Sequence, residues 1–513
     1  MLPDDVLLAI FDFSVFKLQI KFHPVFGRYH AKVEIDSWKS LVHVCRRWRG
    51  LVFGSPRSLN LQLLCTPRTS SRKSLDVWPA LPLFIQGDVS ETSVDNVIAE
   101  LEHSNRICHI DLDFHTTSHI PVENLLKAMQ VPFPELAVLF LSFAGLSYAP
   151  VLQVPYSLLG GSAPRLRSLK LVDAPFLGLP KLLSFATNLV ELSLLNIPHS
   201  GYISPEAMVT CLSVLTSLED LHIEFYSPQS CPDQETRRPP PPTRSVLLAL
   251  KKISFKGVNE YSEELLARID TPRLDHFSTI FFNDINFDIP ELIRFFTRTF
   301  KAPNAIRVVF GSLTARIALH HHEHSSPFAH VKILCRVPDW QLSSMAQICT
   351  SFLPFLSTPE HLYIHEDPPS PLDWKDGIEN TEWLELLVPF TAVKNLYLSE
   401  EFQLRIAPAL QEITGGGIAE VLSTLQNIYL KDYPSSKPIH EAFSQFISVR
   451  NLTIYDWDRY GGYGEYSDRY GRYDSYYDEY DYGHGHGGDD YGYRSSRDNS
   501  RDDYDDDRSE DRH

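Results

Sequence analysis

The sequence lacks any apolar run of the roughly 18 residues that a membrane-spanning helix needs. Its first apolar stretch, residues 6–16, has no basic flank and contains Asp12, so it is also a poor secretory signal. The seven cysteines are odd in number, scattered and never spaced as Cys-x-x-Cys, which argues against both a disulfide framework and a zinc module. We therefore expect a protein without a membrane span in a reducing compartment, the cytoplasm or the nucleus.

Motifs of catalysis and cofactor binding are also missing. The sequence has no Gly-x-Ser-x-Gly and no His-Glu-x-x-His, and its glycine run at 415–417 is not followed by the Lys-Ser/Thr of a phosphate-binding loop. The histidine-rich run 320–324 could bind a transition metal only loosely, because consecutive side chains point in different directions, and a polar loop is the favoured interpretation. We predict no catalytic residues, no metal and no cofactor, and hence a non-enzymatic protein.

A clustered basic face, which is the usual mark of a nucleic-acid-binding protein, is missing as well. The net charge is −18, and residues 457–513 contribute half of it, because 17 acidic residues face only 8 arginines there. From residue 458 onward there is no Leu, Ile, Val, Ala, Met or Phe, so the tail 457–513 is predicted to be disordered. Its Tyr, Arg and Gly could make weak stacking contacts, but its charge opposes phosphate, which favours a solvating or condensate-prone tail over an RNA-binding one.

What the chain does have is a repeated apolar pattern. Leu-x-x-Leu-x-Leu, with Ile, Val or Phe in some positions, occurs thirteen times between residues 107 and 454, and three of these copies, around Phe277, Val309 and Leu362, are weaker. The middle residues lie 22 to 34 apart, which is the spacing expected for one strand and one return helix. One unit cannot bury its own apolar face, so the units must stack with parallel strands inside and helices outside. The pattern predicts an α/β leucine-rich-repeat-like solenoid over residues 91–456; an open α/β sheet is the alternative.

Other segments of the array can be assigned from local patterns. Residues 64–90 are predicted to hold a linker and an edge strand that is preceded by prolines, 78–85. Loops are predicted over 227–244, with a proline run at 237–242, and over 366–381, and long loops often determine binding specificity. Amphipathic stretches predict helices over 122–130, 179–186, 205–215, 263–269, 291–300, 342–352 and 441–447.

The first 63 residues follow a different, helical pattern. Pro3, Asp4 and Asp5 are the residue types that favour a helix start, and apolar residues follow at helical spacing. A second amphipathic stretch, predicted to place Cys45 in the helix core, contains Trp38, Leu41, Val42, Cys45, Trp48 and Val52. So short a segment cannot bury this much apolar surface alone, so either the rest of the chain or another protein must cover it.

This N-terminal pattern resembles the F-box, a small all-α module that docks onto the Skp-type adaptor of cullin-based ubiquitin ligases. The opening Leu-Pro-x-x-hydrophobic-Leu-x-x-Ile and the closing Val-Cys-basic-Arg-Trp of that family are both present within 1–63. The connection 12–37 is longer than usual, and either a surface insertion or a gene-model error explains it; whether it permits adaptor binding stays open. The resemblance implies that the core and the adaptor-facing surface of the module are formed by Leu2, Pro3, Val6, Leu7, Ile10, Trp38, Leu41, Val44, Cys45 and Trp48.

An F-box followed by degenerate leucine-rich repeats resembles a large group of fungal F-box proteins. The resemblance implies a non-catalytic adaptor subunit that binds a Skp-type adaptor, and through it a cullin, and brings a protein substrate to ubiquitin-dependent degradation. Exposed strand residues of the solenoid would then bind the substrate, and the candidates are Lys170, Ser193, His222, Tyr397 and Tyr429. The alternatives are a repeat scaffold without a ligase role and an RNA-associated protein that acts through its tail.

Overall fold

The computed structural model describes most of the chain up to residue 457. The described residues are 2–15, 18–23, 28–33, 38–55, 59, 61–68, 80–114, 119–143, 154–231, 243–282, 288–323, 325–335, 337–367, 379–414, 421–431 and 437–457. They all belong to one compact unit, Met1–Gly462. The proline run 237–242, the centre of the loop 366–381, the glycine run 415–417 and the tail from residue 458 onward lie outside the described residues.

The N-terminal module is mainly helical, as predicted. Its helices are α1 (Asp4–Val15), α2 (Trp38–Val42) and α3 (Arg46–Gly54). An antiparallel hairpin of β1 (Leu18–His23) and β2 (Arg28–Val33) lies within the predicted insertion, so the expectation of an all-α module is wrong there. Leu18, Ile20 and Phe22 alternate with polar residues, and this period of two favours a strand over a helix.

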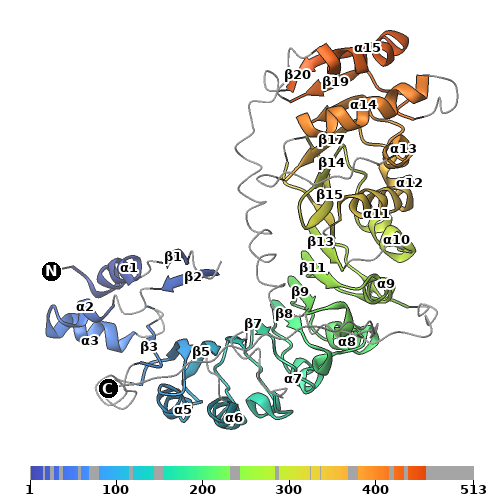
Figure 1. Ribbon diagram of the computed structural model, residues 1–513. Coiled ribbons are helices and arrows are strands. Elements are labelled where there is room, and N and C mark those ends of the chain that lie inside the picture. The colour runs from blue at the N-terminus through green and yellow to red at the C-terminus, as the bar shows by residue number, and fades with distance from the viewer. Residues whose placement is uncertain are drawn as a thin grey trace, which may run out of the picture. The chain divides into compact units, whose positions relative to one another are not determined.

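In the rest of this unit, sixteen of the described strands lie side by side in one sheet (Figure 1). All thirteen copies of the apolar pattern coincide with strands of this sheet, so the fold is an α/β solenoid with a mostly parallel sheet. In spatial order the strands are β3 (Leu63–Cys65), β4 (Leu83–Val89), β5 (Ile107–Phe114), β6 (Val138–Ser142), β7 (Ser168–Val172), β8 (Glu191–Ile197), β9 (Asp220–Phe225), β11 (Lys252–Gly257), β13 (His276–Phe281), β16 (Ala329–Leu334), β15 (Thr314–His320), β14 (Ala305–Phe310), β17 (His361–Glu366), β18 (Asn395–Leu398), β19 (Asn427–Leu430) and β20 (Thr453–Asp456).

The start of the sheet differs from the prediction. The edge strand predicted over 78–85 corresponds to β4, which is internal because it pairs with both β3 and β5. The edge is instead β3, whose residues Leu63 and Cys65 are buried. The sheet therefore begins at residue 63, ahead of the predicted start of the solenoid at residue 91.

Helices cover one side of the sheet and leave the other side to strand residues (Figure 1). Strand β7 illustrates the division, because Leu169 and Leu171 are buried in the core while Lys170 between them points to the opposite side. All seven predicted helices are present, and α5, α12, α13 and α14 were not predicted. The helices are α5 (Val94–Leu101), α6 (His119–Ala128), α7 (Leu179–Leu183), α8 (Pro205–Ser213), α9 (Asn259–Ala267), α10 (Pro290–Thr299), α11 (Pro338–Ser351), α12 (Leu353–Leu356), α13 (Asn380–Leu387), α14 (Glu400–Thr414) and α15 (Lys437–Arg450).

Strand β15 interrupts the parallel order. It is antiparallel to both of its neighbours, β14 and β16, so the chain passes from β13 to β14, turns back along β15 and returns beside β13 as β16. A parallel pair needs a crossover of about a dozen residues or more, whereas only 311–313 separate β14 from β15. Buried Gln341 holds the turn, because its Nε2 donates to the carbonyls of Gly311 at 2.8 Å and Cys335 at 2.7 Å.

Candidate protein-interaction surfaces

The N-terminal module divides its apolar residues between a core and a surface. Leu7 and Trp38 are buried, and Phe11 packs on half-buried Trp48 with ring centroids 4.7 Å apart. Nε1 of Trp38 donates to the carbonyl of Gln62 at 2.9 Å, which ties the module to the segment that leads into β3. These residues are therefore positioned by packing, and their substitution would disturb the fold.

Cys45 is not in the helix core, contrary to the prediction. It is exposed and is the N-cap residue of α3, where its Sγ accepts a hydrogen bond from the backbone N–H of Trp48 at 3.5 Å. Residues 43–45 break the predicted continuous helix into α2 and α3, which turns the cysteine outward. A side chain that caps a helix satisfies one of its free N–H groups, so this position supports the start of α3.

Four of the predicted adaptor-facing residues form an exposed apolar surface. Leu2 is 52% exposed, Val6 39%, Ile10 45% and Val44 59%. Leu2, Val6 and Ile10 are four residues apart, a spacing that follows one side of a helix. Arg47 brings the start of α3 to this side, because its guanidinium donates to the carbonyl of Leu2 at 2.7 Å. We call the four residues the apolar stripe.

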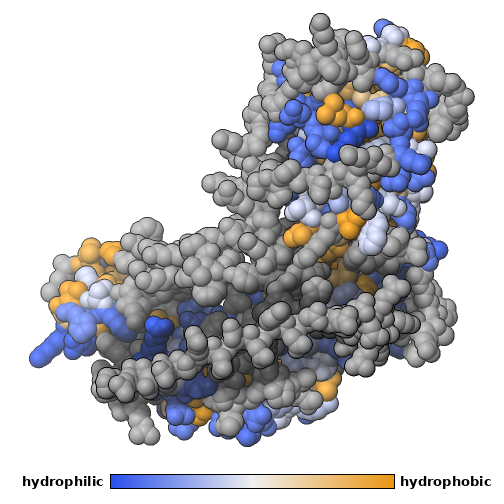
Figure 2. Space-filling model, viewed as in Figure 1, coloured by the Kyte–Doolittle hydropathy of each residue, from blue (hydrophilic) through white to orange (hydrophobic). Residues whose placement is uncertain are grey.

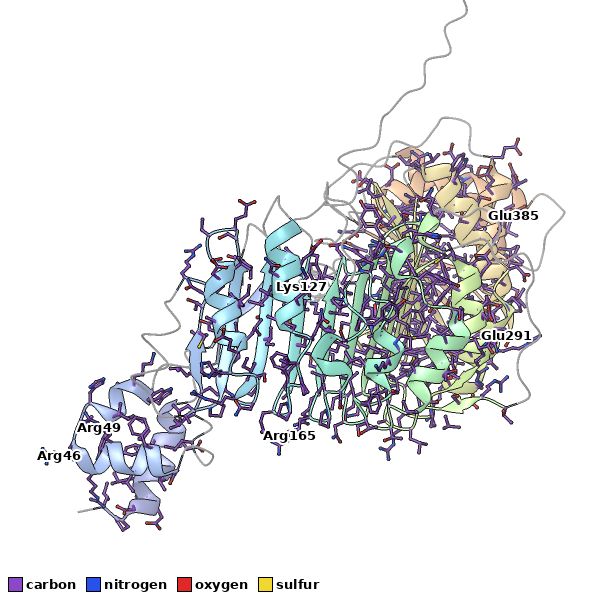
Figure 3. The ribbon with its side chains drawn as sticks, turned by 90° about the horizontal axis from the view of Figure 1, so that it is seen from below. Arg46, Arg49, Lys127, Arg165, Glu291 and Glu385 are labelled. Carbon is purple, nitrogen blue, oxygen red and sulfur yellow. The ribbon has the colours of Figure 1, made fainter. Side chains whose placement is uncertain are left out.

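The surroundings of the apolar stripe are polar. Pro3, which directly precedes α1, is also exposed, and Leu41 is half-buried. Figure 2 shows hydrophobic side chains gathered on this module. Arg46 and Arg49 are exposed along α3, where Figure 3 labels them. An exposed apolar patch with a charged rim is typical of a protein-binding site.

On the solenoid, one row of side chains crosses the strand side of the sheet in register. All five residues that the sequence predicted as substrate-binding belong to this row. In spatial order it contains Gln86, Asp111, Phe140, Lys170, Ser193, His222, Ser254, Ser278, His330, Ala318, Arg307, Tyr363, Tyr397, Tyr429 and Tyr455.

Exposure within the row differs from the prediction. Lys170, His222 and Tyr429 are partly exposed, but Ser193 is only 6% exposed and Tyr397 only 7%. Ser193 has a short side chain between two longer ones in the row, and Tyr397 lies between two other rings. The expectation that all five are exposed is therefore wrong for these two residues.

The imidazole of His222 contacts a buried carboxylate. Its Nε2 lies 3.0 Å from Oε1 of Glu224, which is buried on the next strand-side position of β9. Burial alone would raise the pKa of Glu224, but the hydrogen bond with His222 and the positive charges of His222, Lys256 and Lys170 outweigh it, so the pKa is lowered. Glu224 therefore remains ionised and adds negative charge to this part of the strand side.

Four tyrosines at the end of the row stack as a ladder. Ring centroids of Tyr363 and Tyr397 are 4.1 Å apart, those of Tyr397 and Tyr429 4.3 Å, and those of Tyr429 and Tyr455 5.0 Å. Parallel strands in register lie about 4.8 Å apart, so identical side chains at one register position stack face to face. We call these four residues the tyrosine ladder. The guanidinium of Arg307 lies 5.2 Å from the Tyr363 ring centroid and extends the stack by a cation–π contact.

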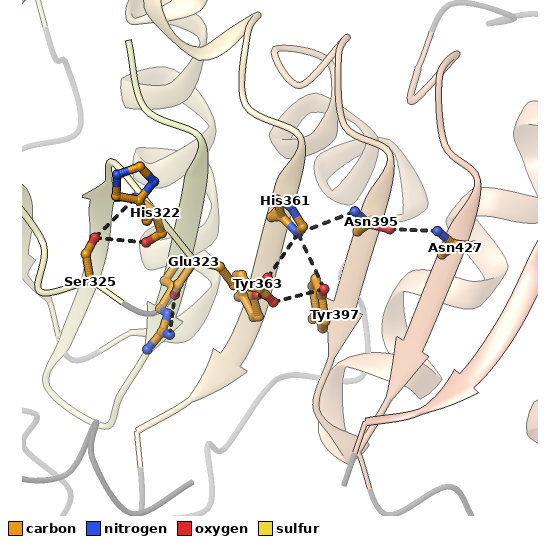
Figure 4. A network of polar contacts seen from close by, with 9 residues as sticks. His322, Glu323, Ser325, His361, Tyr363, Asn395, Tyr397 and Asn427 are labelled. Atoms are coloured by element: carbon orange, nitrogen blue, oxygen red, sulfur yellow. Dashed lines mark hydrogen bonds and ion pairs between the residues drawn. The ribbon is translucent and has the colours of Figure 1, made fainter. Parts of the chain in front are cut away.

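Glu323, from the loop between β15 and β16, reaches across to the ladder (Figure 4). The hydroxyl groups of Tyr363 and Tyr397 both donate to its Oε1, the latter at 3.1 Å, and Arg307 donates to its backbone carbonyl at 3.3 Å. Burial is the largest cause that raises the pKa of both tyrosines, and the nearby Glu323 carboxylate raises it further. Both phenols therefore stay neutral and remain donors. The polar-loop interpretation of 320–324 fits residues 321–323, but His320 is the buried last residue of β15, and residue 324 lies outside the described residues. No motif in the sequence indicates the contact of Glu323 with the ladder.

A second polar row supports the ladder. Nδ2 of Asn427 donates to Oδ1 of Asn395 at 2.7 Å, and Nδ2 of Asn395 lies 3.4 Å from Nδ1 of His361 (Figure 4). These three residues are in register on β17, β18 and β19. The side-chain amides therefore fix the relative position of the three strands that carry most of the ladder.

Replacing Glu323 with alanine should lower the free energy of unfolding by about 1–3 kcal/mol, because two buried hydroxyl groups lose their acceptor. Hydrogen exchange should rise in β17 and β18. Glu385→Ala, at an exposed glutamate of α13 that Figure 3 labels, is the matched control and should leave both quantities unchanged. Equal effects of the two substitutions in chemical denaturation would refute the role of Glu323.

Among the residues that the structure describes, no cluster of His, Cys, Asp and Glu is arranged to hold a metal ion. His320 is buried with Nδ1 2.7 Å from the carbonyl oxygen of Ser325, and His321 stacks on Phe328. Within the same described ranges, no helix has the length and apolar character needed to cross a membrane.

Comparison with known proteins gives structural likenesses only. No family model matches the chain, and no curated protein does. A solved structure of the leucine-rich repeat-containing protein LegL7 from Legionella pneumophila is 13% identical, with a TM-score of 0.25, and covers 75% of this chain and 98% of that one. A structure of the TLR13–ssRNA13 complex is also 13% identical, with a TM-score of 0.28, and covers 76% of this chain and 48% of that one.

Proposed function

We propose that this chain is the substrate-recognition subunit of a Skp–cullin ubiquitin ligase. The observation that carries the proposal is the apolar stripe, which lies on the helical module whose sequence resembles the F-box. Leu2, Val6 and Ile10 stay exposed while their neighbours Leu7 and Phe11 are buried, which is the division expected of a module that docks by one side of its first helix. A Skp-type adaptor would cover this stripe and join the chain to a cullin, in the cytoplasm or the nucleus.

The solenoid would supply the substrate-binding surface. Stacked repeats present one long continuous side of strands, and such surfaces commonly bind proteins. The proposed substrate contacts are the partly exposed members of the row, Lys170, His222 and Tyr429, with Ser193 and Tyr397 beside them. No chemistry would be done by the chain itself, because holding a substrate close to a ubiquitin-charged enzyme raises its effective concentration and orients its lysines.

Substituting the apolar stripe should weaken adaptor binding strongly without unfolding the protein. In Val6→Asp/Ile10→Asp, two carboxylates would be buried against the adaptor, so we expect a loss of affinity of at least about thirtyfold, the scale of a single interface hot spot. The measurement is a titration of the purified full-length protein with a Skp-type adaptor by calorimetry. The thermal midpoint of the variant should match that of the parent because both residues are exposed.

The matched control is Val246→Asp/Leu248→Asp, which places the same charges on residues that are 56% and 63% exposed at and beside the short strand β10 (Ser245–Val246). It should bind the adaptor as the parent does. Failure of the unmutated protein to bind any Skp-type adaptor would refute the ligase role and leave a repeat scaffold. Binding that survives in the stripe variant would refute the assigned docking surface.

A further inference from the structure

A cleft of about 740 Å³ lies along one edge of the sheet. The residues that line it come from the turns that precede β6, β7, β8, β9 and β11, which are five neighbouring parallel strands. Parallel strands begin at the same edge of a sheet, so these turns lie side by side. The cleft therefore runs across the repeats, and it shares no residue with the row on the strand side.

The charges of the cleft leave one cation without a carboxylate. Arg165, which Figure 3 labels at this edge, forms an ion pair with Glu135. Glu219 forms another with Lys251, whose Nζ lies 2.7 Å from its Oε2. Arg167 is exposed and has no ion-pair partner among the residues that the structure describes. The cleft therefore presents one uncompensated positive charge.

Arg167 is held near the middle of the cleft by its backbone. Its N–H donates to the carbonyl of Ala137 at 2.7 Å, and its own carbonyl accepts from the N–H of Val190 at 2.7 Å. These two residues are its neighbours on the adjacent turns, and neither carries a charge. A guanidinium in this setting can bind a carboxylate of a ligand through two parallel hydrogen bonds.

Neutral polar groups continue the cleft beyond Arg167. Asn188, Thr216 and Ser217 line it and are exposed. Nδ2 of Asn188 donates to the carbonyl of Pro164 at 2.8 Å, which orients the amide and leaves its Oδ1 as an acceptor. Hydroxyl groups both donate and accept, so these side chains suit the alternating N–H and C=O groups of a peptide backbone.

A row of exposed apolar residues follows one side of the cleft. Phe185, Val214 and Val246 are all exposed, and each lies four residues before the first leucine of the apolar pattern in its own repeat. The cleft residues lie within two residues of that leucine. The chain turns tightly between the two positions, as the hydrogen bond of 3.1 Å from the N–H of Leu218 to the carbonyl of Leu215 shows. We call the three exposed residues the apolar rim.

An extended peptide fits the dimensions and the chemistry of the cleft. From β6 to β11 there are four strand spacings of about 4.8 Å, roughly 19 Å, which about six extended residues cover. Side chains of an extended peptide alternate in direction, so acidic residues can face Arg167 while apolar residues contact the apolar rim. A nucleic acid fits less well, because Glu135 and Glu219 would repel its phosphates.

We propose that this cleft binds an extended peptide of a partner protein in which acidic and apolar residues alternate, with one peptide carboxylate on Arg167. The peptide lies at the edge of the repeats, apart from the tyrosine ladder. The solenoid then has two binding surfaces, one on its strand side and one along its turns. This inference does not rest on the ligase role, because the apolar stripe takes no part in it.

Fluorescence polarisation with the full-length protein tests the proposal. The probes are a labelled Leu-Glu-Leu-Glu-Leu-Glu peptide and its uncharged counterpart, Leu-Gln-Leu-Gln-Leu-Gln. We expect saturable binding of the acidic peptide and at least about fivefold weaker binding of the uncharged one, the factor that corresponds to a charge contact of about 1 kcal/mol in water. Arg167→Gln should weaken the acidic peptide by the same factor and leave the uncharged one unchanged. Arg273→Gln, at an exposed arginine in the turn before β13, is the control and should affect neither peptide.

The apolar rim has a separate test. Phe185→Ser/Val214→Ser should weaken both peptides at least about fivefold, because apolar contact does not depend on the charge of the ligand. The matched control, Val388→Ser/Leu404→Ser, changes two exposed apolar residues outside the cleft and should bind as the parent does. Circular dichroism checks that all variants fold. No saturable binding, equal affinity for the two peptides, or an unchanged affinity in Arg167→Gln or in the rim variant would each overturn the proposal.

Discussion

Phe296→Ala should lower the free energy of unfolding by about 3–5 kcal/mol, the usual cost of emptying a fully buried phenylalanine site. Phe296 lies on α10 and has no exposed surface. Its ring centroid is 5.2 Å from that of Phe277 on β13, 5.2 Å from that of Phe352 at the end of α11, and 6.0 Å from that of Phe355 on α12. The residue thus joins the repeats on the two sides of the antiparallel strand β15.

Because Phe296 lies between repeats, its replacement should also change the shape of the unfolding transition. The stability of a repeat array is approximately a sum of repeat terms and nearest-neighbour interface terms. Weakening the interface next to β15 should therefore broaden the single unfolding transition or divide it in two, which differential scanning calorimetry can resolve. Phe185→Ala, at a position that is 50% exposed, is the control and should shift neither the midpoint nor the width. A destabilised variant that keeps one sharp transition would contradict the linking role.

The strands could be predicted because their signal is local. Each Leu-x-x-Leu-x-Leu copy places one apolar residue in a turn and two on the buried side of the following strand, as Leu166, Leu169 and Leu171 do for β7. Strand β15 was missed because it lacks the repeated pattern, although its buried residues Ala315, Ile317 and Leu319 occur at every second position, which is typical of a strand. The spacing of 22 between the copies at Val309 and Val331 is the shortest of all, but the spacing of 23 between Leu169 and Leu192 includes helix α7, so spacing does not distinguish β15 from an ordinary repeat.

The candidate surfaces were predicted less completely, because contacts and exposure depend on residues far apart in the chain. A spacing of four in Leu2, Val6 and Ile10 is visible in the sequence, yet only packing decides that Leu7 faces inward. Tyr397 and Tyr429 were selected from their strand positions, but Glu323 lies 74 residues before Tyr397 and carries no motif. The existence of the row could be inferred from repeats that pair in register. Which of its residues are buried could not be inferred from the sequence.

Glu100→Gln should stabilise the protein at neutral pH, against the usual direction of a core substitution. Glu100 lies on α5 with no exposed surface, and neither of its carboxylate oxygens has a hydrogen-bond partner among the described residues. Burial raises the pKa of this carboxyl to about 8 from an ordinary value of 4.5. The folded protein therefore binds a proton at Glu100 that the unfolded chain, whose carboxyl is already ionised at neutral pH, does not bind.

The sign of the pH dependence follows from this difference. Because the folded state binds more protons between pH 4.5 and 8, stability is greatest below the unfolded pKa and falls as pH rises through this window. At pH 7 the loss amounts to roughly 3 kcal/mol, from 1.36 kcal/mol for each unit above the unfolded pKa. Glutamine does not titrate. The free energy of unfolding of Glu100→Gln should therefore exceed that of the parent by up to about 3 kcal/mol at pH 7 and by almost nothing at pH 4.5.

Urea denaturation at pH 4.5, 6, 7 and 8 measures the difference between the parent and Glu100→Gln directly. The advantage of the variant should grow steadily with pH, because ionising the buried carboxyl is what destabilises the parent. Glu102→Gln, at the exposed end of the same helix, should give a flat difference. A flat difference for Glu100→Gln would mean that the carboxyl ionises in the folded state at little cost. In that case water or a polar group reaches Glu100, and α5 packs less tightly on the sheet than its burial indicates.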